Sequence, residues 1–297
     1  MQQVIQIVRT SLGSKLKDYM MLTKISLTIM VVFSSVVSYL LVPKIVGFNW
    51  EMVGWLFAAG ILVSGSANAI NQTIEKDIDA KMNRTANRPI AAGRMSKEEG
   101  IVFAVITGFI GITILATLFN IQAAFIALVS LILYAFVYTP LKKVGSIAVF
   151  VGAIPGALPC LIGWVAGNDS ISAGGLILFA LQFVWQFPHF WAIAWLANDD
   201  YKKAGMKLLP NESSPTRITA LQTIIYSLML IPIGLLPFYF KMSGMISLAL
   251  VFATTVFLVS RCVMLYKNLN RTAARKVMFG SYIYLAVVLM AFLIDKI

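Results

Sequence analysis

Apolar stretches about twenty residues long recur along nearly the whole sequence. Inside a bilayer only helices and closed barrels satisfy every backbone hydrogen-bonding group, and a helix of about 20 apolar residues is long enough to cross it. Nine such stretches are predicted as spans, at residues 22–42, 52–73, 100–119, 122–139, 146–166, 172–196, 218–240, 244–264 and 277–294. With 59% hydrophobic residues and a mean hydropathy of +0.85, the chain is predicted to be an all-α, polytopic membrane protein.

The formal net charge of +12 is explained by where the basic residues lie. Lysines and arginines precede the first predicted span and follow the second, fourth, sixth and eighth, whereas the other connections are nearly free of them. Basic residues accumulate in the cytoplasmic connections of membrane proteins. We therefore expect a multi-pass protein of a bacterial-type cell membrane, with its N-terminus in the cytoplasm, its C-terminus outside and no nucleic-acid partner.

The N-terminal residues 1–21 lack the apolar core and the cleavage site of a signal peptide. Ile5, Val8, Leu12 and Leu16 recur there at helical spacing among basic residues, which predicts a helix in the membrane interface. No linker or low-complexity tract divides the rest of the chain. All 297 residues are therefore expected to form one transmembrane domain.

An unusual concentration of charge follows the second predicted span, in the segment NQTIEKDIDAKMNRTANRP. If the helix continues past Asn71, then Asn71, Glu75 and Asp79 fall four residues apart on one face, and Asp77 points away from them. Three oxygen ligands on one stripe can hold Mg²⁺, which also takes oxygens from substrate phosphates. A solvated, charge-rich loop is the alternative that the spacing leaves open.

Two arginines in the same segment favour a phosphate-bearing substrate over that alternative. Arg84 and Arg88 lie four residues apart and close downstream of the acidic residues. A guanidinium offers forked donors that match the geometry of phosphate oxygens, which a charge serving only membrane topology need not do.

The fourth predicted span ends in YTPLKK, where Tyr138 and Lys142 lie four residues apart with Pro140 between them. We expect Pro140 to interrupt the helix. An interfacial tyrosine followed by lysine is also how an ordinary span ends, so this segment alone indicates little.

Prolines and glycines gather inside the fifth predicted span, in GAIPGALPCLIGW. A helix interrupted at Pro155 or Pro159 is tolerated in a membrane where protein or a cavity satisfies the freed backbone groups. Close helix packing through small residues is the alternative interpretation.

The sixth predicted span holds His189, the single histidine of the chain, among several aromatic residues. An ionisable residue within a span is costly and marks a functional candidate, with a packing histidine as the alternative. Asp199 and Asp200 follow at the cytoplasmic end, with Lys202 beside them. This second acidic and basic cluster, on the same side as the first, indicates cleavage of a diphosphate whose organic part lies in the membrane.

These segments, taken in order, resemble those of the UbiA-type intramembrane prenyltransferases, and most closely the haem-modifying branch of that superfamily. The resemblance covers essentially the whole chain and rests on NQTIEKDIDAKMNRTANRPI, YTPLKK, VGAIPGALPCLIGW and WQFPHFWAIAWLANDDYKKAG. Gln72 and Glu75 depart from the acidic first motif of the superfamily but are similar to the haem-modifying branch. His189 stands where quinone-type members have Asp, which favours a porphyrin acceptor.

The resemblance implies nine helices around a central cavity and transfer of a farnesyl group from farnesyl diphosphate to a vinyl group of haem B, with addition of water. It implies Mg²⁺ ligands at Asn71, Glu75, Asp79, Asp199 and Asp200. It implies diphosphate-binding residues at Arg84, Arg88, Tyr138, Lys142 and Lys202. It implies a haem or prenyl pocket at Trp185, His189, Phe190 and Trp191.

The implied product, haem O, would serve terminal oxidases directly or as a precursor of haem A, so a haem A synthase and terminal oxidase assembly are the implied partners besides membrane lipid. The nearest alternative is a prenyltransferase acting on an aromatic acid or quinone precursor. A membrane transporter is a more distant one, because the polar residues cluster at one membrane edge instead of forming a path across it.

Overall fold

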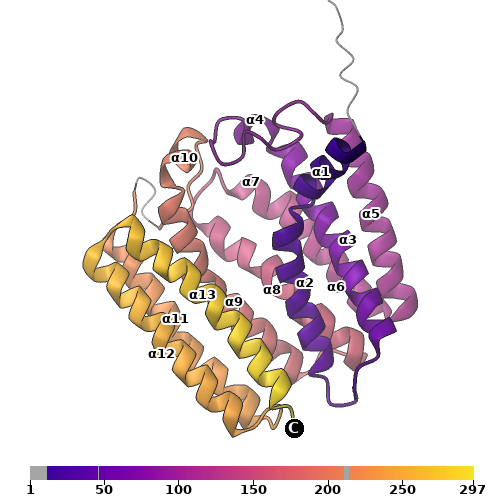
Figure 1. Cartoon of the computed structure of the whole chain (residues 1–297), viewed down its shortest axis with the longest axis vertical. Coiled ribbons are helices and arrows are strands. Elements are labelled where there is room, and N and C mark those ends of the chain that lie inside the picture. The colour runs from indigo at the N-terminus through magenta and orange to yellow at the C-terminus, as the bar shows by residue number, and fades with distance from the viewer. Residues whose placement is uncertain (1–11, 46, 211–213) are drawn as a thin grey trace, which may run out of the picture.

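The computed structural model describes residues 12–45, 47–210 and 214–297, and these form a bundle of helices (Figure 1). Within these ranges the β-type pairing is limited to one isolated bridge, between Ser243 and Lys296. Helix α1 (Leu12–Leu22) meets α2 (Ile25–Leu40) at an angle of 51°. The predicted N-terminal helix is thus present in its second half, whereas Ile5 and Val8 lie outside the described residues.

The helices that follow agree with the predicted spans. They are α3 (Trp50–Ile74), α5 (Lys97–Leu118), Ile121–Leu141, which begins with α6 (Ile121–Ile132), α8 (Ile147–Asn168), α9 (Ala173–Leu196), α11 (Arg217–Tyr239), α12 (Met245–Asn268) and α13 (Arg271–Ile294). By length and composition, eight described helices are able to cross a membrane, and nine if α1 and α2 form one bent span. The predicted all-α, multi-pass membrane architecture is confirmed.

The last helix begins at Arg271, well before the predicted residue 277. Asn270 caps it, because its side-chain oxygen accepts a hydrogen bond from the backbone N–H of Ala273 at 2.8 Å. The basic residues that were predicted to lie in a connection therefore form the first turns of α13.

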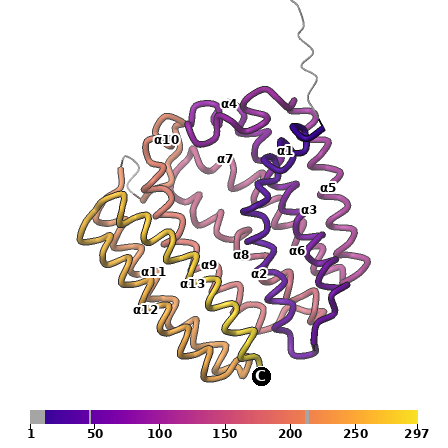
Figure 2. Tube along the Cα trace, viewed as in Figure 1, coloured from indigo at the N-terminus to yellow at the C-terminus, as the bar shows by residue number. Residues whose placement is uncertain are grey.

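The helices pack as two groups that share α2 and α8. In Figure 2 α3, α5 and α6 lie on one side and α11, α12 and α13 on the other, with α2 and α8 between them. One buried cluster, including Leu56, Val63 and Leu115, fills the first group, and another, including Leu258 and Tyr284, fills the second. Packing of this kind stabilises helices in a membrane, where neighbouring lipid is as apolar as the side chains.

Helix α8 is continuous through both of its prolines. Pro159 has no N–H for the carbonyl of Pro155, and that carbonyl accepts a hydrogen bond from Ser130 Oγ of α6 at 3.3 Å instead. Gly163 lies directly against the backbone carbonyl of Ser35 on α2, where no side chain would fit. The packing interpretation of this proline-rich and glycine-rich segment is confirmed.

The helix that begins as α6 also continues past its proline. It widens into a π-helical turn, Leu133–Tyr138, and resumes as α7 (Thr139–Leu141), which contains Pro140. The backbone N–H and the hydroxyl of Thr139 both donate to the carbonyl of Tyr134. The expected interruption at Pro140 is wrong, because the wider turn accommodates a residue without an N–H.

Three short helical segments gather at one end of the bundle, and the C-terminus lies at the other end (Figure 1). The short segments are α4 (Lys76–Asp79), α7 and α10 (Asn198–Lys203). At the opposite end, Lys296 Nζ donates to the carbonyls of Leu40, Val42 and Ile45 at 2.7, 2.7 and 2.8 Å. These bonds join the end of the last helix to the end of α2, and burial lowers the pKa of Lys296.

Candidate active site

The first acidic segment bends at Glu75. Helix α3 runs past Asn71 to Ile74, as the spacing argument assumed, and α4 begins at Lys76 after a break at Glu75. Helical hydrogen bonds nevertheless cross the bend, from Glu75 N to Asn71 O at 2.9 Å and from Asp79 N to Glu75 O at 2.7 Å. Asn71, Glu75 and Asp79 all stay buried, whereas Asp77 is exposed as predicted.

Each of the two buried carboxylates has its own cation. Lys142 Nζ lies 2.9 and 3.1 Å from the carboxylate oxygens of Glu75, and Arg88 Nη1 lies 2.7 and 2.6 Å from those of Asp79. The lysine comes from the residue after α7 and the arginine from the connection after α4. The folding of the chain thus joins two segments that the sequence analysis had treated separately.

Asn71 connects these ion pairs. Its amide nitrogen donates to Glu75 Oε2 at 2.9 Å and to Thr139 Oγ1 at 3.1 Å, and its amide oxygen accepts from Lys24 Nζ at 3.1 Å. Lys24 and Thr139 were not predicted as site residues. Lys24 had been assigned to membrane topology, and nothing in the sequence distinguishes it from the other lysines before the first span.

Lys24 reaches the site from the bend between α1 and α2. Its backbone is left-handed, with φ +50°, which a residue other than glycine rarely adopts. Gln72 donates to the last two carbonyls of α1 at 2.9 and 2.8 Å, and Asn68 donates to the carbonyl of Thr23 at 3.1 Å. Gln72 therefore holds the bend in place.

Burying Asp79 carries an electrostatic cost that Arg88 opposes. Burial raises the pKa of the Asp79 carboxyl, and the guanidinium of Arg88 opposes that shift. Lys24 is close enough to interact electrostatically with both carboxylates and with the other two cations. The side chains of Lys24, Arg88 and Lys142 thus lie with the two carboxylates in one site.

Tyr138 supports one of these cations. The ammonium of Lys142 lies 4.7 Å from the centre of the Tyr138 ring, within range of a cation–π interaction. The ring in turn lies against Gly152 of α8, where an added Cβ would come within 2.6 Å of it. Lys142 therefore contacts both the ring of Tyr138 and the carboxylate of Glu75.

The second acidic segment is arranged differently. The carboxylate of Asp200 accepts hydrogen bonds from the backbone N–H groups of Asn83 and Arg84, both at 3.3 Å, and the Arg84 guanidinium lies 5.9 Å from the centre of the Tyr201 ring. The side chain of Asp199 is 80% exposed and lies 3.8 Å from Arg271.

Lys202, the remaining predicted residue of this segment, is exposed. Among the described residues, no three His, Cys, Asp or Glu side chains lie together as a candidate metal site. The structure therefore places the second segment beside residues 83 and 84 without bringing its carboxylates into the buried cluster.

His189 contacts the neighbouring helix α13. Its Nδ1 lies 2.8 Å from Ser281 Oγ, and that hydroxyl donates to the carbonyl of Met278 at 2.7 Å. With the hydroxyl hydrogen donated to Met278, Nδ1 carries the proton and Nε2 keeps its lone pair; in the other tautomer the hydroxyl donates to Nδ1. No described residue bonds to Nε2. Ser281, which fixes this orientation, was not identified from the sequence.

The aromatic residues around His189 divide into two groups. Trp185 stacks on its ring, with centroids 5.0 Å apart, and Phe190 lies beside it at 5.8 Å. Trp191 instead packs on Tyr226 of α11 at 5.1 Å, and its indole N–H has no hydrogen-bond partner among the described residues. Trp185 and Phe190 thus accompany the histidine, whereas Trp191 belongs to the packing between α9 and α11.

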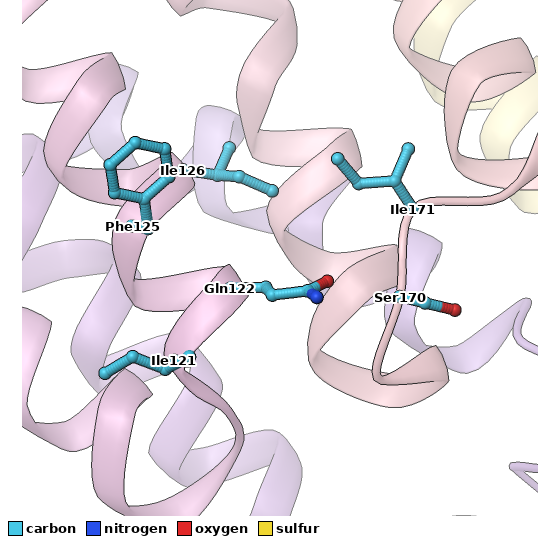
Figure 3. A pocket seen from close by; sticks show the side chains of 6 residues that line it. All are labelled: Ile121, Gln122, Phe125, Ile126, Ser170 and Ile171. Carbon is cyan, nitrogen blue, oxygen red and sulfur yellow. The ribbon is translucent and has the colours of Figure 1, made fainter.

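A cavity of about 560 Å³ opens far from these residues (Figure 3). It lies between the start of α6 and the connection from α8 to α9, and its lining is formed by Ile121, Gln122, Phe125, Ile126, Ser170 and Ile171. A second cavity of about 40 Å³ lies among α2, α3, α5, α6 and α8. Neither of these two cavities is lined by a predicted site residue.

Comparison with known proteins agrees with this architecture. The model of the UbiA prenyltransferase family matches residues 31–288. A protein of Cytophaga hutchinsonii named protoheme IX farnesyltransferase is 41% identical over 286 residues, covering 96% of this chain and 100% of that protein. One of the same name from Flavobacterium johnsoniae is 43% identical over 292 residues, covering 96% of each.

Two solved structures have a similar fold. One, from work on digeranylgeranylglyceryl phosphate synthase, has a TM-score of 0.77 at 22% identity and covers 95% of this chain and 98% of its own. The other, a UbiA homolog from Archaeoglobus fulgidus bound to GPP and Mg²⁺, has a TM-score of 0.63 at 14% identity and covers 93% and 99%. At these identities the likeness concerns the fold alone.

Proposed function

The chain belongs to the UbiA prenyltransferase family, and we propose that it transfers a farnesyl group from farnesyl diphosphate to a vinyl group of haem B, with addition of water, giving haem O and diphosphate. The observation that carries the choice of acceptor is the 41% and 43% identity to relatives named protoheme IX farnesyltransferase over 96% of the chain. The buried His189, whose Nε2 bonds to no described residue, supports a haem acceptor over a phenol.

The oxygen donors around Asn71 fit Mg²⁺. The amide oxygen of Asn71 and the carboxylates of Glu75 and Asp79 are hard ligands of the kind that this ion prefers. We propose that they hold Mg²⁺ together with Asp199 and Asp200 of the second acidic segment. When bound, Mg²⁺ would neutralise the negative charge that develops on the departing diphosphate. A related structure is bound to GPP and Mg²⁺, which supports a metal-dependent reaction.

The cations of the site would bind the diphosphate itself. The proposed residues are Arg84, Arg88, Tyr138, Lys142 and Lys202. Arg88 and Lys142 now neutralise Asp79 and Glu75, and a diphosphate would draw them to its own oxygens. Donors held in place where charge develops stabilise the transition state, and one such donor is worth about 3–4 kcal/mol.

The acceptor side of the site needs a dry, aromatic environment. As the carbon–oxygen bond breaks, positive charge develops on the farnesyl carbon, and the faces of Trp185 and Phe190 are proposed to stabilise it and exclude water. The haem vinyl group then attacks that carbon, and water adds to the resulting cation as the hydroxyl group. Nε2 of His189 would either bind the haem iron or accept a proton from this water.

A product assay tests the reaction. The purified protein is incubated with farnesyl diphosphate, Mg²⁺ and either haem B or 4-hydroxybenzoate, and the product is identified by mass. We expect haem O from the haem B incubation and no prenylated benzoate. Prenylated benzoate alone would make the protein an aromatic prenyltransferase. No diphosphate release with either acceptor, together with ion-dependent movement of substrate in liposomes, would indicate a transporter.

A spectrum tests the assignment of His189. The visible spectrum of bound haem is compared between the wild type, His189→Ala and Trp191→Phe, which removes an indole from the packing against α11. We expect His189→Ala to change the spectrum or the rate of haem O formation and Trp191→Phe to preserve the spectrum. If His189→Ala leaves both spectrum and rate unaltered, His189 is a packing residue.

A further inference from the structure

Helices α9 and α13 lie side by side (Figure 2), and two contacts fix how they are aligned. Inside the bundle, Ser281 Oγ lies 2.8 Å from Nδ1 of His189, and the backbone carbonyl of Ser281 accepts a hydrogen bond from the indole N–H of Trp185 at 2.7 Å. At the end that carries α10, a guanidinium nitrogen of Arg271 lies 3.8 Å from the carboxylate of Asp199. The segment from 189 to 199 therefore runs antiparallel to the segment from 271 to 281.

Arg275 lies between these two contacts on a defined face of α13. Residues seven positions apart complete about two helical turns, so Arg275 and Tyr282 lie on the same face. The ring of Tyr282 lies edge-on to the ring of His189, with centroids 4.7 Å apart. Along the helix axis, Arg275 is about 9 Å from Ser281. An exposed arginine thus follows, two turns along one face, the residue that contacts the histidine.

The guanidinium of Arg275 makes no hydrogen bond, ion pair or ring contact with a described residue. Other arginines near it do have such contacts. Arg271 faces Asp199, and Arg261 of α12 lies 4.6 Å from the centre of the Phe257 ring. A guanidinium presents a planar fork of donors that matches the two oxygens of a carboxylate. Arg275 is therefore available to an anionic ligand that lies on its face of α13.

The proposed acceptor has carboxylates of its own. Haem B carries two propionates on one edge of a flat, apolar ring and its vinyl groups on the opposite edge. The separation of about 9 Å between Arg275 and Ser281 is comparable with that between the centre of a haem and its propionates. We propose that Arg275 binds a propionate of the haem acceptor, so that the face of α13 from Arg275 to Tyr282 forms one wall of the acceptor site. The inference rests on the proposed function, because it takes haem B as the acceptor.

This placement also gives the acceptor a direction. A propionate held at Arg275 leaves the opposite, vinyl edge of the porphyrin pointing away from Arg275, toward the rest of the bundle. The phosphate of an anionic lipid is another ligand that suits an exposed arginine near the end of a membrane-spanning helix. The haem is favoured over the lipid, because Arg275 shares its helix face with the residue that contacts His189, and a lipid headgroup requires no such alignment.

Haem binding with and without the propionate charges tests the proposal. Full-length protein in detergent is titrated with haem B and with its dimethyl ester, which has the same ring but no carboxylates, and binding is followed in the Soret band. We expect Arg275→Gln to weaken haem affinity about ten- to a hundredfold, as loss of a charged hydrogen bond implies, and to leave the affinity for the ester unchanged. Arg275→Lys keeps the charge without the fork, and its haem affinity should fall between those of the wild type and Arg275→Gln.

Lys276→Gln is the matched control. It removes one positive charge from the next position of the same helix, and Lys276 Nζ lies 3.8 Å from the sulfur of Met264 on α12. This variant should bind haem B and the ester as the wild type does. Equal haem affinity of Arg275→Gln and the wild type would overturn the proposal, and so would an equal loss for haem B and the ester. Loss of co-purified anionic phospholipid from Arg275→Gln at unchanged haem affinity would instead make Arg275 a lipid-binding residue.

The haem O assay separates this inference from the proposed function. If the wild type makes haem O and its haem affinity does not depend on Arg275, the reaction stands and the role of Arg275 falls. If haem affinity depends on Arg275 and on the propionates but neither haem B nor 4-hydroxybenzoate is prenylated, the haem-binding face stands and the proposed reaction falls.

Discussion

The two acidic segments look alike in the sequence but have opposite surroundings in the structure. Glu75 and Asp79 are 2% and 0% exposed, and each lies within 3 Å of a cation. The side chain of Asp199 is 80% exposed and lies 3.8 Å from Arg271, whose side chain is 61% exposed. An exposed pair contributes little to stability, whereas breaking a buried pair leaves a charge without water or partner.

This difference indicates that the two segments have different roles. The buried segment is built around Arg88, Lys142 and Lys24, and its geometry is fixed by Asn71 and by the bend between α1 and α2. The second segment is attached through backbone N–H groups, because Asp200 holds those of Asn83 and Arg84. The first is thus suited to determine where the diphosphate lies, and the second to bring the loop of Arg84 next to it.

The largest effect is expected from breaking a buried pair on one side only. Lys142→Met leaves Glu75 buried without its cation, which should cost about 3–5 kcal/mol of stability and abolish haem O formation. Thermal unfolding in detergent and the product assay measure the two consequences. A loss of stability below about 1 kcal/mol would show that the buried pair of Lys142 and Glu75 contributes no more than an exposed ion pair does.

The double variant Lys142→Met with Glu75→Gln is the control for that prediction. Removing both charges should restore most of the lost stability while the protein stays inactive, since the proposed metal and diphosphate contacts are both gone. Recovery of activity in the double variant would show that neither residue takes part in the reaction.

The overall architecture could be read from the sequence because long apolar runs leave few alternatives in a membrane. The ends of α3 and α9 fall close to the predicted residues for this reason. The start of α13 was missed because a basic, polar stretch can continue a helix once Asn270 caps it. The turn at Pro140 was missed because the π register depends on Thr139, whose contact with Tyr134 has no sequence signature.

The residue types of the site could be predicted, but their partners could not. The spacing correctly predicted that Asp77 points away from the face that holds Asp79, because helical geometry is local. The pairing of Glu75 with Lys142 and of His189 with Ser281 joins distant segments, and charge type alone does not choose among several candidates. Lys24 is the clearest case, since only the bend before α2 distinguishes it from other basic residues of the N-terminal region.

An intermediate effect is expected from Asp200→Asn. The amide retains one acceptor oxygen for the two backbone N–H groups of Asn83 and Arg84 but loses the charge, and with bonds as long as 3.3 Å the cost should be about 1 kcal/mol. The displaced loop should raise the KM for farnesyl diphosphate, because Arg84 is proposed to bind it. Asn83→Ala keeps the backbone N–H and is the matched control. An unchanged KM in Asp200→Asn would show that the second segment does not contribute to diphosphate binding.

The smallest effect on stability is expected from the exposed pair of Asp199 and Arg271. Arg271→Met and Asp199→Asn should each change the free energy of unfolding by less than about 1 kcal/mol, because both side chains are already solvated. Their effects on the reaction should nevertheless differ. If Asp199 helps to hold Mg²⁺, Asp199→Asn raises the Mg²⁺ concentration needed for half-maximal activity, whereas Arg271→Met leaves it unchanged or lowers it by freeing the carboxylate. Identical Mg²⁺ dependence in the wild type and both variants would remove Asp199 from the metal site, and the buried segment would then be the one acidic cluster with a role in catalysis.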